Sequence, residues 1–291
     1  MKVAIHGRPC KEDALAYLQS MFDYLKKCNI SLQIYQPFKI FLEKKGINYF
    51  NHPCYSRKEE IFDADFMFSL GGDGTLLEAI TFIERRNIPI LGINLGRLGF
   101  LATTPRNEIN NAIDLLLAKK FRINERSLIK LIEGEELFND INYGLNEFAI
   151  LKRDTSSMIV VHTYLNDEYL NSYWADGLLI STPTGSTGYS LSCGGPLVMP
   201  QNNLFILTPV SPHNLNVRPL IVPDNVTLSF EVESRSNSFL ISLDSRSVKV
   251  PTKTKLSVKK EDFKIRLVEL ENYNYFQTLR DKLNWGLDLR N

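Results

Sequence analysis

The chain has 291 residues, with 34 Lys and Arg against 33 Asp and Glu, and 44% of its residues are hydrophobic. This length predicts one large domain or two ordinary ones, and 17 Phe and 12 Tyr suit a folded core. With a formal net charge of +1, the chain lacks the excess of basic residues that is typical of proteins that bind nucleic acid. No apolar run reaches the roughly 18 residues of a membrane span. We therefore expect neither nucleic acid nor a membrane as a partner. The four cysteines form no CxxC pair, which indicates reduced thiols in a cytoplasmic protein.

The first part of the chain alternates between strand-like apolar runs and helical spacing. The runs 3–6, 32–35, 66–70 and 88–94 predict strands, and the stretches 14–25, 40–45, 76–83 and 109–117 predict helices. Connections between them are short, which is typical of βαβ units. We therefore predict an α/β domain over 1–125 with a mostly parallel sheet.

The pattern changes near residue 126, where short alternating segments separated by turn residues predict a β-rich second domain over 126–270. The predicted strands are 128–133, 157–165, 177–181, 205–210, 226–232, 239–243, 255–259 and 264–268. The tail returns to helical spacing over 273–290. Since a helix does not fit easily into a sheet domain, we expect the tail, 271–291, to pack back on the first domain.

A glycine-rich turn, Gly71-Gly72-Asp73-Gly74-Thr75, lies between a predicted strand and a predicted helix. Glycines allow a ligand to approach the backbone closely, and a helix N-terminus favours an anion such as phosphate. Asp73 would bring a carboxylate that can accept a proton from a hydroxyl. Most of the acceleration of a phosphoryl transfer would come from in-line positioning of the reacting groups and from Mg²⁺, which neutralises the phosphoryl oxygens. The alternative is a tight turn in which Asp73 or Thr75 caps the helix.

Two further polar segments follow strand-like stretches. Arg97, in the segment 94–101 that contains two more glycines, could pair with phosphate or be an ordinary surface arginine. Asn146 and Glu147 offer an amide beside a carboxylate, which suits an adenine edge and a ribose diol. Taken alone, this dipeptide is too common to indicate a site.

The most informative stretch runs from Asp176 to Ser190. Residues 177–190 carry no charge and combine hydroxyls and glycines, so the segment offers many hydrogen bond donors and one aromatic face, Tyr189. The alternative is a hydrophilic surface loop. Farther along, His213 is interpreted as structural, and Asp244-Ser245-Arg246 as a hairpin turn.

Together these segments resemble the NAD kinase family, in the same order along the chain. The resemblance rests on 71–75, 94–101, 146–147, 176–190, 212–215 with 218–220, 243–245 and 275–279. The glycine–aspartate turn alone is weak, because lipid kinases and phosphofructokinase-like proteins have similar ones. Asp-Gly followed by Ser-Thr-Pro-Thr-Gly-Ser-Thr is close to diagnostic for the family.

The resemblance implies phosphorylation of the 2′-hydroxyl of the adenosine ribose of NAD by ATP, giving NADP, on a phosphofructokinase-like α/β domain joined to a β-rich one. Asp73 would be the proton acceptor, and Gly71, Gly72, Gly74 and Thr75 would bind phosphate. The implied NAD-binding residues are Asp73, Gly74, Asn146, Glu147, Asp176, Thr187, Gly188, Tyr189, Ser190, Leu191, Ser192 and Arg246.

The resemblance also implies partners and a metal. Mg²⁺ would enter with ATP, because no carboxylate cluster in the sequence suggests a dedicated protein site for it. In the family the second aspartate motif reaches NAD on a neighbouring subunit, which implies a homodimer or homotetramer in which Asp176 acts across an interface.

The sequence departs from the family pattern at Ala175, where relatives often have Gly, and at Gly188, where they more often have Ala. These differences leave the preference for NAD or NADH open. Two other functions remain as alternatives. A lipid kinase would share the glycine–aspartate turn but would need a basic or apolar membrane-facing surface. A nucleotide sensor would bind NAD or NADP without turnover.

Overall fold

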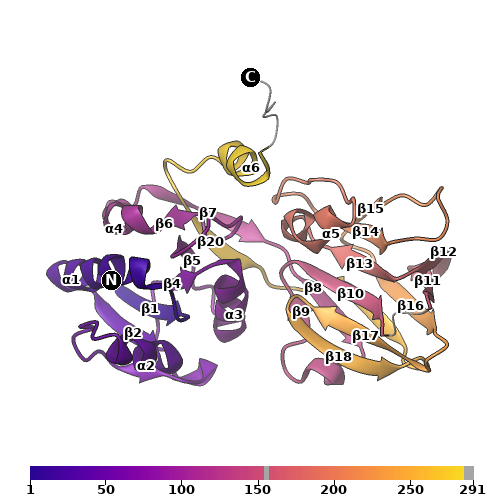
Figure 1. Cartoon of the computed structure of the whole chain (residues 1–291), viewed down its shortest axis with the longest axis horizontal. Helices are drawn as coiled ribbons and strands as arrows, with labels where there is room; N and C mark the ends of the chain where they lie inside the picture. Colours follow the sequence, from indigo (N-terminus) through magenta and orange to yellow (C-terminus); the bar gives the residue numbers. More distant parts are fainter. Residues whose placement is uncertain (154–156, 285–291) are drawn as a thin grey trace. The chain divides into compact units, whose positions relative to one another are not determined.

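The computed structural model describes residues 1–153 and 157–284 (Figure 1). The chain divides into two compact units: Met1–Asn124 together with the chain from Arg266 on, and Glu125–Ile265. Both parts of the predicted fold are present, an α/β unit with a mostly parallel sheet and a β-rich unit. No helix in the described ranges is long and apolar enough to cross a membrane.

The α/β unit is built on one sheet with the strand order β3-β2-β1-β4-β5-β20-β7, and β6 pairs with β5. Its strands are β1 (Lys2–Gly7), β2 (Ser31–Tyr35), β3 (Cys54–Tyr55), β4 (Phe66–Gly71), β5 (Ile90–Asn94), β6 (Thr104–Pro105), β7 (Phe121–Arg126) and β20 (Ile265–Leu270). Its helices are α1 (Leu15–Lys27), α2 (Gln36–Lys44), α3 (Asp73–Ile83), α4 (Ile109–Leu117) and α6 (Tyr275–Leu283). The pairs from β3 through β20 are parallel, so the carboxyl ends of these strands share one edge of the sheet.

Alternation along the strands separates the two faces of this sheet. Val3 and Ile5 of β1 pack into a core with apolar residues of α1, α2 and α4. In α1 the buried positions Leu18, Met21, Phe22 and Leu25 follow the helical repeat. The opposite face carries His6 of β1, and helix α3 packs against β4 and β1. Helix α3 begins at Asp73, directly after β4.

Strand β20 joins the parallel sheet, although the sequence pattern groups its residues with the β-rich domain. Leu267 pairs with Ile90 in parallel orientation, and Figure 1 shows β20 among the strands of the α/β unit. Ile265, Leu267 and Val268 are buried, and a strand covered on both faces loses the alternation that would mark its place. The tail follows as predicted, with α6 in the same unit. Positions 285–290 of the predicted tail helix lie outside the described residues.

The β-rich unit contains two antiparallel sheets, with the orders β15-β14-β13-β10-β17-β18 and β12-β11-β16-β19-β8-β9 in the described residues. The strands are β8 (Ile129–Glu133), β9 (Tyr143–Gly144), β10 (Glu147–Lys152), β11 (Ile159–Leu165), β12 (Glu168–Ala175), β13 (Gly177–Ser181), β14 (Leu204–Val210), β15 (Leu220–Pro223), β16 (Leu228–Glu233), β17 (Ser238–Leu243), β18 (Arg246–Pro251) and β19 (Leu256–Lys260), and one short helix is α5 (Tyr189–Ser192). Apolar side chains from both sheets form one core, so the unit is a β-sandwich.

Candidate active site

The glycine–aspartate turn connects β4 to α3 in the α/β unit. Gly72 is the residue before the helix, in extended conformation, and no side chain caps the helix start. The interpretation of Asp73 or Thr75 as the cap is therefore wrong. A Cβ on Gly71 would lie 2.1 Å from the Thr75 hydroxyl, whereas Gly72 and Gly74 have no atom within 4 Å of that position. The backbone of these two glycines is open to a ligand at the positive end of α3.

The Asp73 carboxylate holds the loop that follows β5. Its Oδ1 accepts hydrogen bonds from the N–H groups of Leu101 (3.0 Å) and Ala102 (2.9 Å), and its Oδ2 accepts one from Phe100 (2.9 Å). Gly99 lies so close that a Cβ there would sit 1.9 Å from Oδ1. Two segments predicted separately from the sequence, 71–75 and 94–101, thus form one structure around this carboxylate.

The strand order explains why a ligand would bind at this edge. From β1 the chain continues outward to β2 and β3, whereas β4 and β5 extend the sheet in the other direction. The order reverses between β1 and β4, and open α/β sheets bind ligands at the carboxyl edge where the order reverses. The glycine–aspartate turn begins at this point, directly after β4.

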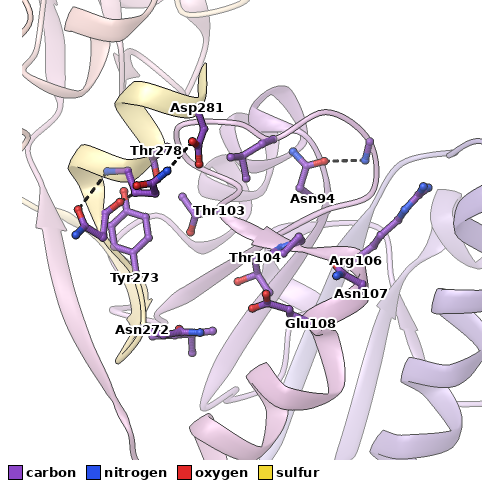
Figure 2. Close-up of a pocket in the computed structure, with 16 residues that line it drawn as sticks. Asn94, Thr103, Thr104, Arg106, Asn107, Glu108, Asn272, Tyr273, Thr278 and Asp281 are labelled. Atoms are coloured by element: carbon purple, nitrogen blue, oxygen red, sulfur yellow. Dashed lines mark hydrogen bonds between the residues drawn. The ribbon is translucent and has the colours of Figure 1, made fainter. Parts of the chain in front are cut away.

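A polar cavity of about 480 Å³ lies along the same edge, after β5 and β20 (Figure 2). Its lining includes Asn94, Thr103, Thr104, Asn107, Tyr273, Thr278 and Asp281, which come from the middle and the tail of the chain. The Asn94 amide accepts a hydrogen bond from the Gly96 N–H at 2.7 Å and donates one to the Arg97 carbonyl, so this side chain fixes the start of the loop. Sequence reasoning did not find this cavity, since its walls are remote in sequence.

A second cluster lies in the β-sandwich around the start of β10. Asp244 and Ser245 form the predicted hairpin turn between β17 and β18, with Leu243 opposite Arg246. The carboxylate of the half-buried Asp244 also accepts hydrogen bonds from the N–H groups of Leu145 (2.8 Å), Asn146 (2.7 Å) and Glu147 (3.2 Å). The hairpin aspartate therefore fixes the backbone on which the Asn146 and Glu147 side chains are presented.

Glu147 is a buried acid in this cluster. Desolvation, with a smaller contribution from the nearby Asp244, raises the pKa of Glu147 to about 8. Its Oε2 is buried without a hydrogen bond partner among the described residues, and a Cβ on Gly188 would lie 3.5 Å from that oxygen. Desolvation raises the pKa of Asp244 as well, but the three N–H groups that donate to its carboxylate favour its charged form, whereas no such donor in the described residues reaches Glu147 Oε2. We therefore assign the proton of this pair to Glu147. A protonated Glu147 can donate a hydrogen bond to a ligand oxygen.

The uncharged segment after β13 uses most of its hydroxyls internally. The Thr182 hydroxyl donates to the Leu145 carbonyl, the Ser186 hydroxyl donates to the Pro183 carbonyl, and the hydroxyls of Ser190 and Thr208 pair. The expectation that hydroxyls of this segment are ligand donors is thus too broad. Its accessible members are Thr187, Gly188 and Tyr189, with Leu191 and Ser192 directly after it, and Tyr189 is 41% exposed.

Two other predicted residues have charged or polar partners. Asp176 forms an ion pair with Lys152, with 2.6 Å between Oδ1 and Nζ, and Lys152 was not singled out from the sequence. Arg246 donates to the backbone carbonyls of Ile141 and Tyr143. Desolvation lowers the pKa of its guanidinium. His213 is exposed, and its backbone N–H donates to the Trp174 carbonyl at 2.8 Å, so the interpretation of its side chain as structural stays a prediction.

The residue types in these two clusters are those that nucleotide-binding proteins use. The turn in the α/β unit offers open backbone to phosphate, and the sandwich offers an amide, a neutral acid and an aromatic ring to a nucleoside. Residues 3–121 match the family model for the ATP-NAD kinase N-terminal domain, and residues 145–270 match the model for the ATP-NAD kinase C-terminal domain. The chain belongs to the NAD kinase family.

Similar proteins agree with this membership. The chain is 59% identical to an NAD kinase from Cytophaga hutchinsonii and 44% identical to one from Flavobacterium psychrophilum, over 100% of both chains in each case. The fold is similar to that of yeast NADH kinase complexed with NADH (TM-score 0.85, 21% identity, 100% of this chain and 89% of that chain). It is also similar to an NAD kinase from Archaeoglobus fulgidus in complex with ATP (TM-score 0.77, 24% identity, 98% of this chain and 99% of that chain).

Proposed function

We propose that this enzyme transfers the terminal phosphoryl group of ATP to the 2′-hydroxyl of the adenosine ribose of NAD, producing NADP and ADP. Family membership supports the reaction, and the observation that carries the mechanism is the arrangement around Asp73. Its carboxylate lies in the first turn of α3, between open glycine backbone on one side and the 100–102 loop on the other.

Asp73 acts as the proton acceptor in this proposal. A carboxylate offers about four lone-pair positions, and three of them receive backbone N–H groups here. The remaining position is on Oδ2, which accepts one N–H whereas Oδ1 accepts two. The fixed carboxylate accepts a hydrogen bond from the ribose hydroxyl and then its proton as the oxygen attacks phosphorus. Because a carboxylate is a weak base for an alcohol, in-line positioning supplies most of the acceleration.

The phosphate groups bind at the glycine turn. The exposed backbone of Gly72 and Gly74 meets phosphate oxygens, with Gly71 and Thr75 shaping the turn behind them. Within residues 1–153 and 157–284, no group of three or more His, Cys, Asp or Glu is arranged to hold a metal ion. We therefore expect Mg²⁺ to be held by the ATP phosphates, where its charge offsets the charge of the transferring group.

NAD binds at the sandwich cluster. Asn146 and the protonated Glu147 meet the polar edges of the adenosine, and the exposed Tyr189 ring supplies a stacking surface. Asp176 and Arg246 contact NAD in addition to their partners in this chain. The accessible residues Thr187, Gly188, Leu191 and Ser192 complete the contact region, and the buried Ser190, whose hydroxyl pairs with that of Thr208, supports it from behind.

The test is a coupled assay with an NADP-specific dehydrogenase on wild type and Asp73→Asn. We expect wild-type signal only when NAD, ATP and Mg²⁺ are all present, and a loss of roughly 100-fold or more in kcat in the variant. NAD titration by calorimetry is the control, and NAD binding should largely survive. Near-wild-type turnover in Asp73→Asn would remove Asp73 from the base role. Binding of NAD by the wild type without turnover would favour a nucleotide sensor.

We also propose a homodimer or homotetramer. The sandwich unit exposes large apolar side chains, among them Trp174 (57% exposed) and Leu215 (84% exposed). The Trp174 ring lies 5.7 Å from the His213 ring, between centroids, and Leu215 follows His213 by two residues. Contiguous exposed apolar patches are typical of interaction surfaces, and we propose that these side chains belong to one. Sedimentation velocity tests the assembly, and a monomer at micromolar concentration would contradict it.

A further inference from the structure

An arginine outside the glycine turn lies at the same edge of the α/β unit. Arg8 directly follows β1, and its N–H donates to the carbonyl of Leu70, the residue before Gly71, at 3.2 Å. Gly7 pairs with Leu70 in the β1–β4 ladder, so Arg8 comes next to Gly71 across the two strands. The strand order reverses between β1 and β4, and Arg8 is therefore at the point where such sheets bind their ligands.

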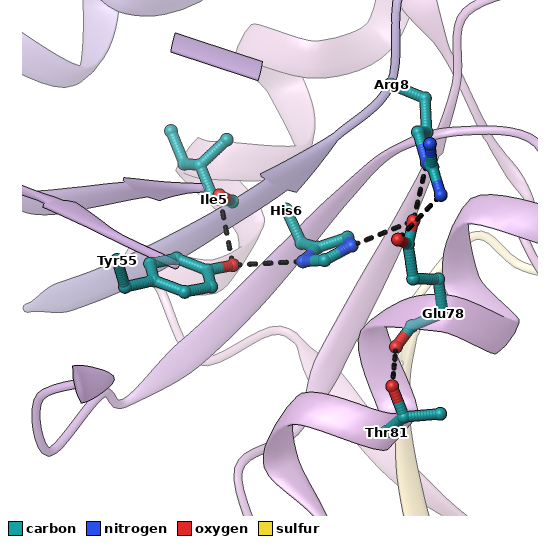
Figure 3. Close-up of polar contacts among 6 residues, drawn as sticks. All are labelled: Ile5, His6, Arg8, Tyr55, Glu78 and Thr81. Atoms are coloured by element: carbon teal, nitrogen blue, oxygen red, sulfur yellow. Dashed lines mark hydrogen bonds and ion pairs between the residues drawn. The ribbon is translucent and has the colours of Figure 1, made fainter. Parts of the chain in front are cut away.

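The guanidinium of Arg8 is held by a carboxylate of α3 (Figure 3). Its Nε and Nη2 donate to Glu78 Oε2 and Oε1, each at 2.6 Å. The Arg8 side chain is 57% exposed and that of Glu78 is 22% exposed. Glu78 lies five residues after Asp73 on the same helix, which is about 7.5 Å of helical rise. The helix that begins at the proposed base thus also holds this arginine.

Glu78 is itself fixed from the protein interior. His6 Nε2 lies 3.2 Å from Glu78 Oε2, and His6 Nδ1 lies 3.1 Å from the Tyr55 hydroxyl, which reaches the Ile5 carbonyl. The His6 ring is fully buried and stacks on Tyr35 with 4.2 Å between ring centroids. An exposed arginine–glutamate pair by itself has little effect on stability, and it needs no buried support of this kind. The support fixes where the guanidinium points.

We propose that Arg8 binds the triphosphate of the ATP donor and that Glu78 is the residue that positions it. Two of the five guanidinium N–H donors are used by Glu78, which leaves three for phosphate oxygens. Arginine suits this task because its planar fork matches phosphate geometry and its charge is permanent. This inference rests on the proposed function for its reaction but assigns a residue outside the motifs that define it.

The experiment compares Arg8→Ala, Arg8→Lys and Glu78→Gln with wild type. Calorimetric titration with tripolyphosphate alone measures binding without turnover, and steady-state kinetics give KM for ATP and for NAD. We expect Arg8→Ala to raise the Kd for tripolyphosphate and the KM for ATP by roughly 10- to 100-fold, as for a lost charge-assisted hydrogen bond. Arg8→Lys and Glu78→Gln should show smaller increases in the same two constants, and the KM for NAD should stay within about twofold.

Arg122→Ala is the matched control. Arg122 is also exposed (69%) and its Nε pairs with a buried glutamate, Glu269, at 2.7 Å, but it lies on strand β7 at one end of the sheet. This variant should match the wild type in both constants. If Arg8→Ala fails to fold, Arg8→Lys and Glu78→Gln carry the comparison.

Two outcomes would overturn the assignment: equal tripolyphosphate affinity in wild type and the Arg8 variants, or an increase confined to the KM for NAD. A wild type that binds no tripolyphosphate also overturns it. The absence of NADP formation by the wild type would contradict the proposed reaction instead, and the tripolyphosphate titration would still decide the role of Arg8.

Discussion

Replacing Glu147 by Gln should make the sandwich unit more stable relative to wild type as the pH rises. In the unfolded chain this carboxyl ionises near its ordinary value of 4.5, whereas in the folded protein burial and Asp244 raise its pKa to about 8. Between these values folding requires proton uptake, so its contribution to wild-type stability is complete below 4.5 and is lost as the pH rises toward 8. Glutamine has a similar shape but takes up no proton.

The size of this stability difference follows from the pH interval between the pKa of Glu147 in the unfolded chain, 4.5, and its pKa in the folded protein, about 8. Each pH unit inside it changes the free energy of unfolding by about 1.36 kcal/mol per proton taken up. Moving from about pH 5 to about pH 7 should therefore change the difference between Glu147→Gln and wild type by about 2.7 kcal/mol, in favour of the variant. Glu147 is 9% exposed, so solvent screening removes little of this effect.

Urea unfolding at several pH values measures this difference. Using a Trp285→Phe background leaves Trp174, on β12 of the sandwich, as the fluorescent reporter. Glu168→Gln is the control, because Glu168 is an exposed carboxylate of the same unit, and this variant should follow the wild type at every pH. Parallel stability profiles for Glu147→Gln and wild type would refute the assignment of a proton to Glu147.

Two further predictions concern the proposed ligand contacts. Tyr189→Leu should weaken NAD binding roughly 10-fold, since it removes the stacking ring of a residue that is 41% exposed. Calorimetry measures the Kd for NAD, and the control variant Tyr169→Leu, at another exposed tyrosine, should show no such loss. An unchanged Kd in Tyr189→Leu would contradict the stacking role. Gly99→Ala should lower kcat roughly 10-fold or more, because the new Cβ would lie 1.9 Å from Asp73 Oδ1 and displace the carboxylate. The coupled assay measures this, with circular dichroism to confirm the fold, and full activity in Gly99→Ala would show that the position of Asp73 is not critical.

Local sequence patterns were sufficient for the class of fold and for the motifs. Strand and helix periodicities predicted an α/β domain followed by a β-rich one, and the order of the motifs indicated the NAD kinase family, which the family models confirm. The hairpin at Asp244 was predicted from its turn residues. Each periodicity, turn and motif depends on residues within one or two turns or strands, and the order of the motifs is read along the chain, so none of these features requires the tertiary structure.

The tertiary structure decided what the polar residues do. Asp73 receives N–H groups from residues 27 to 29 positions away, Asp244 receives them from 97 to 99 positions away, and Arg8 meets Glu78 across 70 positions. Strands β20 and β7 are neighbours in the parallel sheet, although 138 residues lie between Arg126, where β7 ends, and Ile265, where β20 begins. The raised pKa of Glu147 likewise depends on burial beside a carboxylate that is remote in sequence. Periodicity is a local property of the chain, whereas burial, charge proximity and strand order arise only when distant segments come together.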